Sequence, residues 1–232
     1  MNVLAIDSSM DLSIYGLMSA DKFVSGLSLN FHHDQLKELI PTIDSLLTKN
    51  SLKINDIDLF IVGIGPGSWT GIRVCVTTIK TIAHALNKPI VSINALDLIA
   101  SNIKFSPYPV YSIIDATRDE VYYAQFDCSN SVPYRETEYQ IASIRSLVET
   151  ILAPSIFIGD GVQKYKEQFE QLHNKNIIFS FDAINLPKPS FLIDLGIAKF
   201  KLKGAENVFN MTPLYFQKTS AEQIWELKNS AL

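Results

Sequence analysis

The residues whose types and spacing could do chemistry begin with a glycine-rich corner, GIGPGSWTGIR at 63–73. Glycine-rich turns that lead into helices often hold phosphates. A P-loop needs G-x4-G-K-[ST], and no lysine stands at the required place. A dinucleotide fingerprint needs G-x-G-x-x-G, and Thr70 replaces its last glycine. Both nucleotide signatures fail, which favours a tight strand-to-helix turn with Ser68 or Thr70 as the helix cap.

A second group of polar residues follows apolar runs typical of strands. Asp7, Ser8 and Ser9 end the first of these runs. An acidic residue there could hold a hydrated Mg²⁺ near phosphates. Alternatively, the Asp and Ser side chains bond their own backbone in a turn. Asp115 and Asp160 allow the same two interpretations, so a nucleotide site would use Asp7, Ser8, Ser9 and Asp115.

Other catalytic and metal signatures do not occur in the sequence. It contains no HExxH, no G-x-S-x-G and no pair of histidines at helical i, i+4 spacing. Its two cysteines, Cys75 and Cys128, form no CxxC pair and predict no disulfide framework. We therefore predict no catalytic residue and no metal site.

Charge and targeting signals narrow the class of protein further. The net charge of −4 and the pI of about 5.6 argue against strong unaided binding of nucleic acid. The N-terminal MNVLAIDSS has neither a basic segment nor a long apolar stretch, so we expect no signal peptide. No apolar run approaches the ~20 residues that span a bilayer, and we expect a cytoplasmic protein.

The spacing of apolar residues predicts the elements that position these groups. In 34–47 they recur at i, i+3, i+4 and i+7, which predicts an amphipathic helix that Pro41 should kink. A second helix is expected over 72–86, directly after the glycine corner. The other predicted elements are strands at 3–7, 13–18, 22–30, 58–65, 89–93, 110–116, 120–126 and 155–161, and helices at 95–101, 141–152, 162–173 and 191–202.

Two halves of the chain share one pattern. Each opens with an apolar strand ending in Asp, continues with a hairpin, and then alternates helices with strands ending in Gly. The prolines of 105–110 mark the boundary, so we predict one domain over 1–106 and another over 107–232, with a tail that packs back on the first. The pattern predicts an α/β fold built from a duplicated unit, each a mixed sheet covered by helices.

The helices at 34–47 and 72–86 are apolar over more than one face. Stripes of this kind usually face the core of their own domain. Because the apolar residues extend beyond a single face, a surface for a protein partner is the alternative.

Five segments resemble, in the same order, the bacterial TsaB (YeaZ) family. They are LAIDSS, the helix ending in IDSLL, GIGPGSWTGIRV, the hairpin IIDATRDEVYYAQF, and the closing PLYFQK. The resemblance implies a two-lobed, actin-like (ASKHA) fold. It also implies a role in making threonylcarbamoyladenosine next to the anticodon of tRNAs that read codons beginning with A.

The resemblance further implies a non-catalytic partner. In this family the chain pairs with its paralogue TsaD, which transfers the threonylcarbamoyl group, and the ATPase TsaE joins them. TsaD-like paralogues carry a metal-binding H-x-x-x-H after the strand that corresponds to 89–93, where Ala95 and Ile99 stand here. We therefore expect no enzyme activity and contact with tRNA only through the complex. The apolar helices lead us to expect a homodimer when the chain is alone.

The same resemblance assigns the partner interface to the two helices. With Trp69 as an aromatic prop, its residues would be Leu36, Leu39, Ile40, Ile43, Leu47, Trp69, Ile72, Arg73, Val76, Ile79 and Ala83. A charge at Val76 or Ile79 should then disrupt pairing and leave the fold intact. Cys75 and Thr81 replace family glycines, so contacts here could differ in detail.

A second hypothesis comes from the duplicated strand–Asp pattern. It is an actin-like ATPase or small-molecule kinase that holds a nucleotide between Asp7 and Asp115. For the scaffold hypothesis no cofactor is expected within the chain, and ATP or ADP at the junction with the partner stays open.

Overall fold

A computed structural model describes residues 1–30 and 35–216, with side chains from Lys37 onward in the second range. The strands of the N-terminal half form one sheet in the order β3-β2-β1-β4-β5. β1 pairs antiparallel with β2 and parallel with β4. The five strands are β1 (Val3–Asp7), β2 (Leu12–Ser19), β3 (Lys22–Asn30), β4 (Leu59–Gly63) and β5 (Ile90–Ile93).

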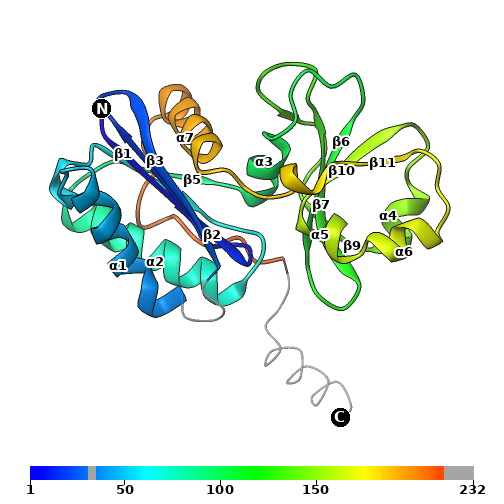
Figure 1. Ribbon diagram of the computed structural model, residues 1–232, viewed down its shortest axis with the longest axis horizontal. Coiled ribbons are helices and arrows are strands. Elements are labelled where there is room, and N and C mark those ends of the chain that lie inside the picture. The colour runs from blue at the N-terminus through cyan, green and yellow to red at the C-terminus, as the bar shows by residue number, and fades with distance from the viewer. Residues whose placement is uncertain (31–34, 217–232) are drawn as a thin grey trace, which may run out of the picture.

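Helices cover both faces of this sheet, as Figure 1 shows. α1 (Gln35–Lys49) and α2 (Trp69–Ala85) pack on one face, and α7 (Pro189–Lys203) packs on the other. β1 and β4 are buried along their whole length, as expected for central strands with helices on both sides. Successive side chains of these strands point to opposite faces of the sheet, so they pack in two separate apolar clusters.

The apolar stripes of α1 and α2 lie inside their own lobe, which corrects the predicted interface. Seven of its residues are at most 4% exposed and pack against β1, β2 and β4, namely Leu39, Ile43, Leu47, Ile72, Val76, Ile79 and Ala83. A single sheet face is wide enough to receive both stripes. These residues stabilise the N-terminal lobe and do not form a surface.

The outward face of the two helices has a different composition. Ile40 is 51% exposed, and Arg73 is exposed at the start of α2. Trp69 is half-buried, and Thr77 and Thr81 are exposed. The side chain of Leu36 lies outside the described part of the structure. A partner on this helix pair would therefore meet mainly polar and hydroxyl side chains.

The C-terminal half forms a second sheet in the order β11-β10-β6-β7-β8, with β9 also paired to β7. Matching positions in the two sheets carry matching strands, because β1, β2, β4 and β5 correspond to β6, β7, β10 and β11. The predicted duplication is thus confirmed. The strands are β6 (Val110–Asp115), β7 (Glu120–Asp127), β8 (Tyr134–Arg135), β9 (Gln140–Ser143), β10 (Ser155–Ile158) and β11 (Ile177–Phe179).

Helices also cover both faces of the second sheet. α3 (Ala95–Ala100) packs on one face, and α4 (Ile144–Glu149), α5 (Asp160–Lys164) and α6 (Lys166–Gln171) pack on the other. Two short 3-10 helices, Ile54–Asp56 and Asp182–Ile184, lie in connecting segments. Each lobe is therefore a sheet between two helical layers.

Two helices pack in the lobe that lies on the other side of the domain boundary predicted near residue 106. α3 precedes the boundary, yet Ala95, Leu96 and Ile99 pack in the core of the C-terminal lobe. α7 follows it, yet Leu192 and Ile193 pack on β1 and β4 in the N-terminal lobe. The lobes are compact in space but exchange one helix each, which a boundary drawn on prolines could not indicate.

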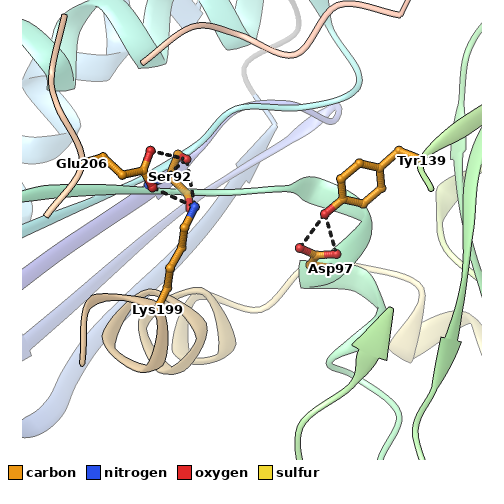
Figure 2. A network of polar contacts seen from close by, with 5 residues as sticks. All are labelled: Ser92, Asp97, Tyr139, Lys199 and Glu206. Atoms are coloured by element: carbon orange, nitrogen blue, oxygen red, sulfur yellow. Dashed lines mark hydrogen bonds and ion pairs between the residues drawn. The ribbon is translucent and has the colours of Figure 1, made fainter. Parts of the chain in front are cut away.

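A polar network holds α7 and the segment that follows it against β5 of the N-terminal lobe (Figure 2). Lys199 on α7 contacts Glu206 at 2.7 Å and donates to the carbonyl oxygen of Ser92 in β5. The backbone N–H of Ser92 donates to Glu206 at 2.9 Å. Burial alone would raise the pKa of Glu206, but the hydrogen bonds from Lys199 and Ser92 outweigh it and lower that pKa. In the C-terminal lobe, the hydroxyl of Tyr139, directly before β9, donates to Asp97 of α3 at 2.8 Å.

Two local predictions were wrong in the C-terminal half. Strand β9 occupies the start of the helix predicted over 141–152. The helix predicted over 162–173 is divided at Tyr165 into α5 and α6. The short strands β8 and β11 were not predicted. In the described residues, no helix combines the length and hydropathy needed to cross a bilayer.

The buried stripe predicts the effect of a charge at Val76. Because this side chain is 2% exposed and packs on the sheet, Val76→Asp should remove about 4 kcal/mol or more from the free energy of unfolding. Thr77→Asp, one position along on the outward face, should change it by less than about 0.5 kcal/mol. Urea unfolding followed by circular dichroism measures both. Equal stability of the two variants would contradict this placement.

Candidate functional site: the cleft between the lobes

The carboxyl ends of the parallel strands in the two sheets border one cleft of about 830 Å³. β1 ends at Asp7 and β6 at Asp115, and the next polar residue after β10 is Asp160. Open α/β sheets commonly bind ligands beyond the carboxyl ends of their strands. The residues that form the walls are Ser9–Asp11, Gly67–Trp69, Ile114–Thr117, Tyr122, Asp160, Gln163, Lys164 and Leu214–Phe216.

The glycine corner forms one wall by pressing its backbone against the β1–β2 turn. The N–H of Ser68 donates to the carbonyl oxygen of Ser9 at 2.6 Å. Gly67 has φ +143°, and a Cβ there would lie 1.9 Å from the same oxygen. The Ser68 hydroxyl accepts from the N–H of Gly71 and caps α2, as one of the two predicted caps. The corner is therefore bonded to the β1–β2 turn, and α2 begins within it at Trp69.

Asp7 lies behind the cleft and not in it. Its side chain is 2% exposed, and one carboxylate oxygen accepts from the N–H of Ser9 at 2.6 Å. Burial raises the pKa of Asp7, and its hydrogen bonds with Ser9 offset part of the rise. A Cβ on Gly63 would lie 2.2 Å from the carboxyl carbon, so this neighbour must be glycine. Of the two interpretations of Asp7, the bond to its own backbone turn agrees with the observed hydrogen bond from Ser9.

Asp115 is held by a cation and a phenol from the following helices. Lys164 donates to it at 2.5 Å and Tyr165 at 2.7 Å, and the N–H of Thr117 adds a third bond at 2.9 Å. Burial alone would raise the pKa of Asp115, but the bonds from Lys164 and Tyr165 outweigh it and lower that pKa. Because Lys164 is occupied by Asp115, its charge is already partly neutralised.

Asp160, which also lines the cleft, has a raised pKa. It begins α5 and accepts from the backbone N–H of Asp115 at 3.1 Å. Burial raises the pKa of Asp160 to about 6, and the nearby charges of Asp115 and Asp11 act in the same direction. Three carboxyl groups thus face a cleft whose lining includes one lysine, Lys164.

The structure brings together only part of the predicted nucleotide set. Ser9 and Asp115 line the cleft, whereas Asp7 and Ser8 are buried behind it. Within the described ranges, no three His, Cys, Asp or Glu side chains lie close enough to hold a metal ion together. The charge of the cleft also suits a nucleotide phosphate poorly, because its carboxyl groups outnumber its cation.

The sequence predicted a tail that packs back on the first lobe, but not that the closing segment also contacts the second lobe. Tyr215 stacks on Trp69, with ring centroids 3.9 Å apart, and Phe216 contacts Tyr122 of the other lobe at 5.6 Å. The only signal was the resemblance of PLYFQK to a family motif, of which Gln217 and Lys218 lie outside the described residues.

Two helix-covered mixed sheets with a shared strand order and a cleft between them define a two-lobed, actin-like protein. The solved structure of YeaZ from Pseudomonas aeruginosa has this fold. It matches with a TM-score of 0.76 at 21% identity, over 93% of this chain and 99% of that one.

A family model described as TsaD, tRNA N6-adenosine threonylcarbamoyltransferase, matches residues 31–231. The tRNA threonylcarbamoyladenosine biosynthesis protein TsaB of Bacillus subtilis is 27% identical over 97% of this chain and 98% of its own length. TsaB of Escherichia coli is also 27% identical, over 95% and 96%. The chain belongs to the TsaD family, and these full-length relatives place it with the TsaB (YeaZ) proteins.

The pKa of Asp160 predicts a pH-dependent gain for Asp160→Asn. Folding raises this pKa from 3.8 to about 6, so between these values the native state binds more protons than the unfolded state, and stability falls as pH rises. An amide avoids this loss and can still accept from the Asp115 N–H. At pH 7 the free energy of unfolding of the variant should exceed that of the parent by about 3 kcal/mol, and the difference should nearly vanish at about pH 3.5.

Chemical denaturation at pH 3.5, 5 and 7 measures this difference. Asp44→Asn, at an exposed position of α1, is the control and should show no such trend. A gain for Asp160→Asn that is independent of pH would contradict the explanation.

The contact between the glycine corner and Ser9 predicts a second effect on stability. Both glycines have positive φ, which strains any residue with a Cβ. The Cβ of Gly67→Ala would also collide with a backbone oxygen, whereas that of Gly204→Ala would have no atom within 4 Å. Positive φ alone should remove about 1–3 kcal/mol. Crowding should remove about 2 kcal/mol more from Gly67→Ala than from Gly204→Ala. Equal losses would show that the corner does not need its close approach to Ser9.

Proposed function

We propose that this chain is a non-catalytic partner of a TsaD-type enzyme in the synthesis of tRNA threonylcarbamoyladenosine. Support comes from the family match over 31–231 and from relatives that are named biosynthesis proteins of this modification. In this proposal the enzyme transfers the threonylcarbamoyl group and this chain holds it in a competent state. TsaE joins the pair, tRNA is contacted through the complex, and the chain needs no cofactor of its own.

The observation that carries the non-catalytic part is the burial of α3. Ala95 and Ile99 stand at the positions that the H-x-x-x-H of TsaD-like paralogues would occupy. Both are fully buried and pack against β6 and β7. A metal ligand at either position would have to replace apolar side chains in the core of the C-terminal lobe. Position and packing therefore both argue for a scaffold.

The outward face of α1 and α2 is the docking surface in this proposal. The apolar stripes of both helices are buried in the core of the lobe. The residues exposed to a partner include Ile40, Arg73, Thr77 and Thr81. Trp69 adds a half-buried aromatic beside Arg73, whose guanidinium carbon lies 5.0 Å from the ring centroid. Small hydroxyl side chains allow helices to approach closely, which suits a helical bundle between two subunits.

The alternative of an actin-like ATPase or kinase has weaker support. It needs Asp7 and Asp115 to face one nucleotide, but Asp7 is buried behind Ser9 and Asp115 is paired with Lys164. Calorimetric titration of the isolated chain with Mg·ATP tests it. Binding that Asp7→Ala abolishes, together with turnover, would favour the enzyme over the scaffold.

Complex formation tests the proposal directly. The purified chain and the TsaD-type protein of the same organism should form a heteromer at micromolar concentration, measured by light scattering on a sizing column. Ile40→Asp and Thr81→Arg should weaken that heteromer at least about tenfold, because each places charge in a packed helical contact. The chain alone is expected to be a homodimer.

Leu152→Asp is the matched control, because Leu152 is 86% exposed and belongs to the other lobe. It should leave the heteromer intact. The proposal fails if no heteromer forms and tRNA modification proceeds equally without this chain.

A further inference from the structure

We propose that residues 214–216 form an aromatic strap that holds the two lobes together across the mouth of the cleft. The inference is independent of the proposed partner and concerns the free chain. It starts from a segment that leaves one lobe, passes the cleft and ends on the other lobe.

The strap is anchored first in the N-terminal lobe. Met211 is 5% exposed and packs in the core beneath α2, and Lys80 of α2 donates to its carbonyl oxygen at 2.8 Å. Three residues further on, the N–H of Leu214 donates to the carbonyl oxygen of Ile64, near the start of the glycine corner, at 2.9 Å. The backbone is therefore fixed up to the edge of the cleft.

Two consecutive aromatic side chains then contact different lobes. The ring of Tyr215 lies on Trp69, at 3.9 Å and 33°, in the N-terminal lobe. The ring of Phe216 lies 5.6 Å from that of Tyr122, in the C-terminal lobe, and packs against the same cluster as α3. Aromatic pairs of this geometry contribute about 0.5–1.5 kcal/mol beyond their buried area. Because the two rings belong to adjacent residues, separating the lobes must break one of the two contacts.

Met10 reaches the same cluster from another loop. Met10, from the β1–β2 turn, is 5% exposed and packs in the C-terminal cluster beside Tyr122. The strap and Met10 thus approach the same cluster from the N-terminal lobe. All the strap residues also line the cleft, so movement of the strap would widen the cleft itself. The Trp69 contact couples this movement to the first turn of α2.

The distance between the lobes tests the strap. Spin labels at Lys49→Cys and Glu170→Cys, both at exposed positions, report that distance by double electron–electron resonance. The natural Cys75 and Cys128 are buried, so labelling is selective. Tyr215→Ala and Phe216→Ala, made singly in the full chain, should each give a longer and broader distance distribution. Phe216→Tyr keeps the ring and should restore the parent distribution.

Phe209→Ala is the matched control. Phe209 lies in the same closing segment and is 70% exposed, but its ring contact is with His84 of the N-terminal lobe. Its distribution should equal that of the parent. Circular dichroism ensures that each variant is folded at the temperature of measurement. The strap is refuted if Tyr215→Ala and Phe216→Ala leave the distance unchanged, or if Phe209→Ala changes it equally.

Discussion

The close approach of the glycine corner to the β1–β2 turn is the constraint on which the rest of this structure depends. Only a residue without Cβ lets the Ser9 carbonyl oxygen reach the Ser68 N–H, because a methyl group at Gly67 would lie 1.9 Å from that oxygen. This contact sets the floor of the cleft and the point from which α2 starts. It also fixes Trp69, which receives the closing segment, and so connects β1, α2 and the C-terminal residues.

The cleft that results has the layout of an actin-like fold, and its described lining carries three carboxyl groups and one lysine. Asp7 is buried behind the cleft, and of the three acids that line it, Asp115 is paired with Lys164. Asp160 has a pKa of about 6 because burial disfavours its charge. A protein that held a nucleotide phosphate here would need cations free to meet it. This charge pattern supports the proposed scaffold over the nucleotide-binding alternative.

Much of the fold could be predicted because strong local patterns decided it. Buried runs such as LAID and LFIV gave central strands, and the shared strand–Asp pattern predicted two sheets, which proved to have a common strand order. Short elements such as β9 and β11 could not be predicted, since their stability comes from neighbouring strands. The exchange of α3 and α7 between lobes depends on contacts far apart in sequence, which periodicity does not record.

The site was harder to predict than the fold. An apolar stripe predicts that one face of a helix is buried, but it does not indicate which surface covers that face. Val76 and Ile79 were therefore assigned to a partner interface, although the sheet of their own lobe covers them. Footprinting by hydroxyl radicals, with and without the TsaD-type protein, tests the central claim most directly. The account predicts that Ile40 and His84, on the outward faces of α1 and α2, lose reactivity in the mixture while Leu152 does not. Unchanged reactivity at Ile40 and His84, with protection elsewhere, would contradict it.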